Sequence, residues 1–252
     1  MCRPGGWLGK DSGVVSDRAV KVWAWIAAEH DGGAPVSMAA VCSAAARRLG
    51  VDGVSVMAVS DGLAREPLSA SDEVSARLEE LQFTTGEGPS ADDFRLGAPV
   101  LVPDLESAAA RWPGFVPEAV AAGARAMFAV PLQAGAIRVG VLTLYRALPG
   151  PLSAGDLADA LVFADFALQL LLDASSGISG QAGYGLLNGL SDSQAAVYQA
   201  TGMISVQLGV SLEEALVRLR AHAFADSAGI GQVASDVVAR RLRFDPDAGA
   251  DA

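Results

Sequence analysis

The chain has 252 residues, which allows one large domain or two ordinary ones, and 51% of them are hydrophobic, enough for a packed core. Its formal net charge of −11 argues against a surface built throughout for nucleic acid. No run of eighteen apolar residues and no signal peptide is visible, and Cys2 and Cys42 show neither metal-ligand nor disulfide-framework spacing, so we expect a cytoplasmic protein without a membrane span.

The N-terminal part predicts a leader followed by two helices. Residues 1–15 are Gly-rich and aperiodic, which is typical of a disordered leader. From Ser16, apolar residues recur at helical spacing until the Gly-rich stretch after His30. A second, Ala-rich helix is expected over 37–49, with Gly50 closing it.

The period then changes from helical to alternating. Residues 53–60 alternate and carry β-branched side chains, and Asp61-Gly62 is a hairpin turn signal. The remaining expected elements are helices over 72–82, shortly after Trp112, and over 154–172, and strands over 99–102, 125–132 and 137–145. This order predicts an α+β fold in which helices flank an antiparallel sheet of four or five strands.

Four segments of this region resemble a GAF domain: Gly86-Glu-Gly-Pro-Ser90, Pro99 to Leu105, Arg111-Trp-Pro-Gly-Phe115, and Val139 to Tyr145. The resemblance spans about residues 17–172, within a sensor domain expected over 16–173. It implies a small ligand, of unknown identity, held between the sheet and a loop. The side chains expected around such a pocket are Phe83, Glu87, Ser90, Phe94, Trp112 and Phe128. The alternative is that these aromatic residues only fill the core.

A Gly-rich linker is expected over 174–191, and three short helices follow it. In the first, Val197, Ala200, Ile204 and Leu208 share one face, and Gly209 suits a left-handed stop. Ser211 and Glu214 form the Ser-x-x-Glu pattern of a capping box. A third apolar stripe runs from Ile230 to Leu242, so the sequence predicts a small three-helix bundle.

The run from Gln199 to Phe224, with Gly-Val-Ser at the turn and Glu-Glu-Ala after it, resembles an ANTAR domain, the RNA-binding module of transcription antitermination regulators. The resemblance covers about fifty residues, within a domain expected over 192–245 and before an acidic tail at 246–252. GAF domains precede ANTAR domains in actinobacterial regulators of this type. Thr201 stands where many members carry a lysine that contacts phosphate.

Residues 193–244 contain five arginines and four acidic residues, so a local basic face is possible on an acidic chain. Guanidinium groups bind phosphate and stack on unpaired bases, whereas small polar residues let the backbone approach closely. The residues expected to bind RNA are Gln199, Thr201, Ser205, Arg218, Arg220, Arg240, Arg241 and Arg243. The alternative is an ordinary solvated rim of arginines.

We find no enzyme signature, no cofactor motif, and no metal loop around Glu87, Asp92 and Asp93. The long helix over 154–172 carries more apolar surface than one sheet face needs, which favours a homodimer. The main hypothesis is a signal-responsive regulator that binds hairpins of nascent RNA and acts by antitermination, controlled by a small ligand or an upstream signalling protein. The alternative is a dimeric protein-interaction module or ligand sensor whose RNA binding is weak or lost.

Overall fold

The computed structural model describes residues 13–29, 36–60, 64–175, 192–226 and 228–245. The expected leader, most of the expected linker and the acidic tail lie outside these residues. Helix α6 reaches Ser175, so the first two residues of the expected linker are helical. Within the described ranges, no helix combines the length and the apolar character needed to cross a bilayer.

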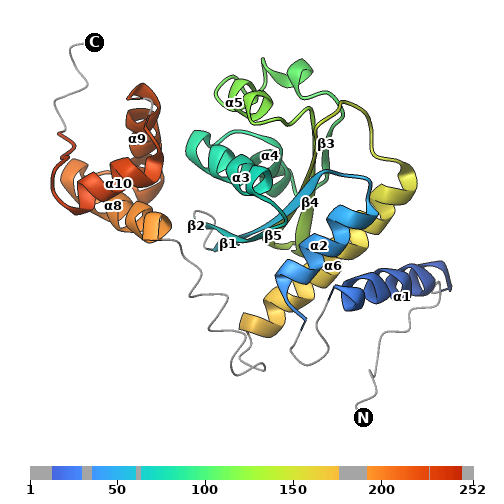
Figure 1. Ribbon diagram of the computed structural model, residues 1–252. Coiled ribbons are helices and arrows are strands. Elements are labelled where there is room, and N and C mark those ends of the chain that lie inside the picture. Colours follow the sequence, from blue (N-terminus) through green and yellow to red (C-terminus); the bar gives the residue numbers. More distant parts are fainter. Residues whose placement is uncertain (1–12, 30–35, 61–63, 176–191, 227, 246–252) are drawn as a thin grey trace.

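Five strands of the described residues form one antiparallel sheet, in the order β2-β1-β5-β4-β3. They are β1 (Gly53–Ser60), β2 (Ala64–Ala70), β3 (Val100–Val102), β4 (Ala126–Ala134) and β5 (Ile137–Arg146). Helices cover both faces of the sheet (Figure 1). The expected α+β class, with an antiparallel sheet and flanking helices, is therefore confirmed.

One face of the sheet packs against α2 (Met38–Arg48) and α6 (Ala154–Ser175), with α1 (Gly13–Ala28) lying outside them. Phe128 and Leu144 point to this face, where Phe163 of α6 is fully buried. The Ser37 side chain caps α2, because it accepts a hydrogen bond from the Ala40 amide. This cap explains why the helix starts there.

The other face packs against α3 (Glu73–Thr85), α4 (Pro89–Leu96) and α5 (Val116–Ala121). Met127 and Ala129 point here because side chains alternate along β4. No helix was expected between residues 82 and 99, whereas α4 begins at Pro89, a favourable first helical residue. We refer to α1 to α6 with the sheet as the sheet domain.

Three C-terminal helices, α8 (Asp192–Leu208), α9 (Leu212–Ala225) and α10 (Ile230–Val238), pack around one apolar cluster. We call them the C-terminal bundle. Gly209 has a left-handed φ of 68°, and the Ser211 hydroxyl accepts from the Glu214 amide, as expected for a helix stop and a helix start. The expected third helix is four residues shorter, because Arg240 adopts a left-handed φ of 59°.

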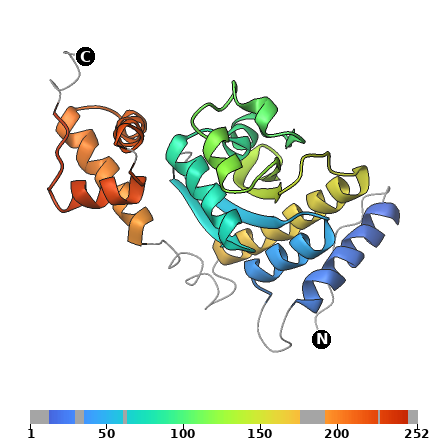
Figure 2. The ribbon, with the colours of Figure 1, turned by 45° about the horizontal axis from the view of Figure 1, so that its top comes forward.

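The bundle lies to one side of the sheet domain, with α9 beside α3 in both views (Figures 1 and 2). Helix α9 therefore joins two parts of the chain that are distant in sequence.

Candidate functional site

A buried polar network lies between α3, α4 and the sheet. The Gln82 side chain donates from Nε2 to Ser90 Oγ at 2.8 Å and accepts at Oε1 from the Ser90 amide at 2.8 Å. Ser90 Oγ also lies 2.8 Å from Thr143 Oγ1 of β5. Because Gln82 and Ser90 are fully buried, these bonds tie two helices and a strand together without competition from water.

Two acidic side chains are buried on the same pair of helices, Glu79 on α3 and Asp93 on α4. Glu79 Oε1 accepts from Ser55 Oγ at 2.9 Å, and both residues are buried. Asp93 is fully buried, and neither of its carboxylate oxygens has a hydrogen-bond partner among the described residues. Burial raises the pKa of Asp93 from its usual 3.8 to about 8, so the group is mostly protonated at neutral pH.

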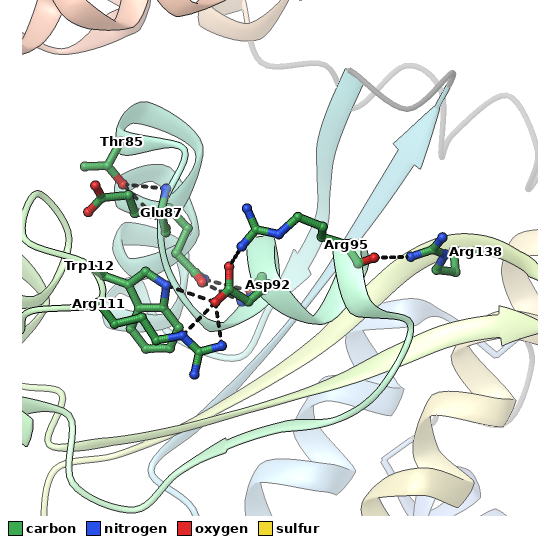
Figure 3. Close-up of polar contacts among 9 residues, drawn as sticks. Thr85, Glu87, Asp92, Arg95, Arg111, Trp112 and Arg138 are labelled. Atoms are coloured by element: carbon green, nitrogen blue, oxygen red, sulfur yellow. Dashed lines mark hydrogen bonds and ion pairs between the residues drawn. The ribbon is translucent and has the colours of Figure 1, made fainter. Parts of the chain in front are cut away.

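Asp92 fastens α4 to the loop before α5. Its Oδ2 accepts from Arg111 Nε at 2.8 Å and from Trp112 Nε1 at 3.3 Å, and its Oδ1 pairs with Arg95 (Figure 3). Two arginines thus neutralise one nearly buried carboxylate. Among the described residues, no group of three or more His, Cys, Asp or Glu side chains is placed to hold a metal ion.

The expected pocket residues do not all lie together. Ser90 and Trp112 are buried on the α3–α4 face, and Phe94 packs there as a partly buried ring. The prediction for Phe128 is wrong, because the alternation of β4 turns this ring to the opposite face, under α2 and α6.

Phe83 and Glu87 lie at the end of α3 and just beyond it. Phe83 packs with the apolar cluster of the C-terminal bundle, not with Trp112, which corrects its expected place in a pocket of the sheet domain. Glu87 is partly exposed, and its Oε2 accepts from the Gly114 amide at 2.8 Å (Figure 3 shows Glu87 beside Thr85).

The bundle presents a groove of about 640 Å³ between α8 and the segment after α10. Its lining includes Gln199, Arg240 and Arg243, three of the residues expected to bind RNA. The other lining residues are Gly202, Met203, Val206, Gln207 and Leu242. No hydrogen bond or ion pair within the described part of the chain engages the side chains of Arg240 and Arg243, so both guanidinium groups can meet a ligand.

The other expected RNA-binding residues lie elsewhere. Arg218 pairs with Glu214 at 2.9 Å, and Arg241 pairs with Asp236 at 2.6 Å. Arg220 faces the sheet domain, where its Nε donates to the Phe83 carbonyl oxygen at 3.0 Å. These three arginines are therefore already engaged within the chain.

The two small hydroxyl residues do not line the groove. Thr201 is buried, and its hydroxyl donates to the Val197 carbonyl oxygen at 2.7 Å, so the expected surface position is corrected. Ser205 Oγ donates to the Val210 carbonyl oxygen at 2.6 Å and so helps to end α8. Local backbone bonds of this kind are common for Ser and Thr within helices.

The groove residues Met203, Val206 and Gln207 and the buried polar residues Gln82, Asp93 and Thr143 were not expected from the sequence. A signal existed for Val206, which lies off the apolar stripe of its helix and is 85% exposed. No comparable signal marked Asp93, because an acid beside a turn is usually solvated.

The fold matches a known family model. The model described as "GAF domain" matches residues 37–171, more than half of the chain. The chain belongs to the GAF domain family. The part of the sheet domain from α2 to α6 is thus a GAF domain, a type of signal-sensing domain, and the match ends before the C-terminal bundle.

Solved structures of GAF domains align with this chain at low identity, and the alignment with the highest of three TM-scores supports the same fold. The GAF domain of a phosphoenolpyruvate-protein phosphotransferase from Coxiella burnetii is 16% identical, with a TM-score of 0.51 over 65% of this chain and 98% of that one. The corresponding Acinetobacter domain is 14% identical, with a TM-score of 0.47 over 66% and 96%. The GAF-B domain of DevS from Mycobacterium smegmatis is 21% identical, with a TM-score of 0.40 over 56% and 94%.

No curated protein gives a significant match to this chain. At such identities the structural likeness concerns the fold alone.

Proposed function

We propose that this chain is a signal-responsive, non-enzymatic regulator that binds RNA hairpins through its C-terminal bundle and acts by transcription antitermination. The observation that carries the proposal is the groove lined by Gln199, Arg240 and Arg243. The ANTAR resemblance of residues 199–224, noted from the sequence, gives this groove its expected ligand.

The groove suits an unpaired nucleotide of a hairpin loop. Arginine side chains bind phosphate and stack on bases, and the Gln199 amide can bond the polar edge of a base. Gln207 can add its Nε2 group, because its Oε1 already accepts from the Phe244 amide at 3.0 Å. Met203 and the exposed Val206 add an apolar surface for the face of the ring. Stacking of this kind contributes about 1–3 kcal/mol per base.

The backbone of Arg240 supports the same interpretation. Its φ of 59° lies in the left-handed region, where glycine is favoured at the end of a helix and a larger side chain costs about 1–2 kcal/mol. An arginine at this position makes the bundle less stable than a glycine would, but it places a cation at the groove.

Filter binding with a paired-hairpin RNA tests the proposal. We expect the double variant R240A/R243A to bind about ten- to hundred-fold more weakly than the wild type. The control is R218A/R241A, which removes the same charge from two arginines paired within the chain. Equal losses in both variants would show that only net charge matters, and unchanged binding of R240A/R243A would refute the site.

We propose that the GAF domain receives one of two signals. The first is a small ligand that binds near Ser90, Phe94 and Trp112, and the second is an upstream signalling protein. The Asp93 carboxyl is fully buried and has no hydrogen-bond partner in the described part of the chain. This observation favours a polar ligand, because a ligand could satisfy the carboxyl oxygens. Native mass spectrometry of the purified protein, before and after gentle denaturation, would reveal a retained molecule. A mass equal to that of the bare chain in both spectra argues for a protein signal.

A homodimer is part of the proposal. Leu161 and Leu172 of α6 remain exposed, as do Val20 and Trp23 of α1, although Phe163 and Leu168 are buried against the sheet. Light scattering with size exclusion at micromolar concentration should show two subunits. A clean monomer would contradict this arrangement.

A second candidate function is a protein-interaction module or ligand sensor whose RNA binding is weak. The net charge of −11 favours it, because phosphate is repelled by most of the surface. Absence of RNA binding even at low salt, where phosphate contacts are strongest, would support this alternative.

A further inference from the structure

The contact between the two parts of the chain centres on Arg220. From the middle of α9, its Nε donates to the Phe83 carbonyl oxygen at 3.0 Å, and its guanidinium carbon lies 5.6 Å from the centroid of the Phe83 ring. Phe83 is in the last turn of α3, where carbonyl groups lack helical partners and the helix dipole favours a cation. A hydrogen bond, a cation–π contact and the dipole of α3 thus all favour this position of the Arg220 side chain.

Phe83 is shared between the two parts. It belongs to α3 by sequence, yet it is 8% exposed and packs with the buried residues of the C-terminal bundle. Its carbonyl group and its ring therefore both face the bundle. A side chain of the GAF domain completes the core of the bundle.

The rest of the contact is open. A hollow of about 570 Å³ separates Thr84, Glu87, Pro113 and Gly114 of the GAF domain from Val217, Ala221 and Phe224 of α9. Val217 and Phe224 remain 55% and 68% exposed beside it. A narrow contact with an anchoring arginine and an unfilled hollow is typical of a reversible interface between domains rather than of a permanent one.

The anchored turn adjoins the buried polar network. Gln82 precedes Phe83 in the chain and holds Ser90, which contacts Thr143 of the sheet. Gly88, between Gln82 and Ser90 in the chain, has a φ of 121°, and a Cβ there would lie 2.5 Å from Gln82 Oε1, so the turn between α3 and α4 packs closely against the Gln82 side chain. Because Phe83 follows Gln82 directly in α3, a shift of the helix end at Gln82 reaches the docking contact.

We propose that residues 83–88, the α3–α4 corner, form a docking surface for the C-terminal bundle of the same chain, anchored by Arg220, and that rearrangement of the network around Gln82 releases the bundle. The docking surface uses α9, whereas the groove is lined by α8 and the segment after α10. The bundle can therefore dock even if its groove binds no RNA. Docking also gives the GAF domain a physical means to act on the bundle.

Hydrogen exchange and small-angle X-ray scattering of the full chain, without RNA, test the anchor. In R220A and F83A we expect amides of 84–88 and 217–224 to exchange at least several-fold faster and the radius of gyration to increase. R218A is the matched control, because it removes the same charge from the same helix, where Arg218 pairs only with Glu214 among the contacts described.

Three results would overturn the anchor. The first is R220A and F83A profiles equal to those of the wild type. The second is equally faster exchange across α8 and α10, which would mean that the bundle has unfolded. The third is protection that disappears on dilution of the wild type, which would place the contact between two copies of the chain.

The variant T143V tests the coupling, because it removes one bond of the network from β5 without touching α3. We expect faster exchange at the α3–α4 corner, smaller than in R220A, with the exchange of α10 unchanged. A corner that exchanges as in the wild type would show that the network does not control docking.

Discussion

The GAF domain and the C-terminal bundle differ in where their polar side chains lie. The GAF domain buries Glu79, Gln82, Ser90, Asp93 and Thr143 between its sheet and helices, whereas the described part of the bundle has Thr201 as its buried polar side chain. The bundle instead places Arg240 and Arg243 at an open groove. The proposed input and output follow this division, because the proposed ligand would enter the polar interior of the GAF domain and the proposed RNA would bind the surface of the bundle.

The largest effect should come from the interior of the GAF domain. Phe128→Ala removes a fully buried ring from the α2–α6 face and should lower the free energy of unfolding by about 3–5 kcal/mol. Phe224→Ala in the bundle, at 68% exposure, should change it by less than about 0.5 kcal/mol. Urea unfolding followed by circular dichroism measures both. Similar losses in the two variants would contradict the described burial.

Two glycine substitutions should change the free energy of unfolding in opposite directions. Gly88→Ala places a Cβ 2.5 Å from Gln82 Oε1 at a φ of 121°, and should destabilise the GAF domain by about 1–3 kcal/mol. Gly202→Ala lies within α8 with nothing within 4 Å of the added atom, and should stabilise the bundle by about 0.5–1 kcal/mol. Thermal unfolding compares the two variants. A change in stability in the same direction in both would contradict the expected difference between the two glycines.

The buried carboxyl predicts a pH dependence. With its pKa raised to about 8, Asp93 holds a proton in the folded state that the unfolded chain loses near the usual value of 3.8. Its stabilising contribution is complete below that usual value and is lost as the pH rises through about 8. The decline is at most about 1.4 kcal/mol per pH unit.

Asp93→Asn should flatten this decline, because the amide does not titrate. Asp17→Asn, at an exposed position of α1, serves as the control and should leave the slope unchanged. Urea midpoints between about pH 5 and 8 provide the measurement. An unchanged slope in Asp93→Asn would mean that the carboxyl reaches water in solution.

The smallest expected stability effect concerns the groove. Arg240→Gly should keep the bundle as stable as the wild type or increase its stability by up to about 1 kcal/mol, because glycine accepts the φ of 59° more easily. RNA affinity should fall in the same variant. Thermal unfolding and filter binding separate the two effects, and a loss of stability would show that the arginine supports the fold.

Local patterns predicted much of the fold. The alternation of residues 53–60, the Ser211–Glu214 pattern and the Gly209 stop correspond to a strand, a helix start and a helix end in the structure. The capping box is only half formed, because the Glu214 side chain pairs with Arg218. Helix α4 escaped prediction, since its eight residues carry several polar side chains that are buried rather than an apolar stripe.

The candidate site was harder to predict. Arginines that look alike in the sequence divide into Arg240 and Arg243 at the groove, Arg218 and Arg241 in local ion pairs, and Arg220 at the docking contact. Which partner an arginine finds depends on elements far away in the chain, and no spacing rule contains that information.

The sequence by itself determined the class of this protein: helix periods, strand alternation and turn residues are local properties, and together they specify a mixed sheet domain followed by three amphipathic helices. Only the tertiary structure decided that Phe128 lies behind the sheet, that Phe83 packs with the bundle and that Asp93 is buried without a bonding partner among the described residues. The physical reason is that burial, pairing and pKa depend on what surrounds a side chain in space, whereas periodicity reports only which side of its own element it occupies.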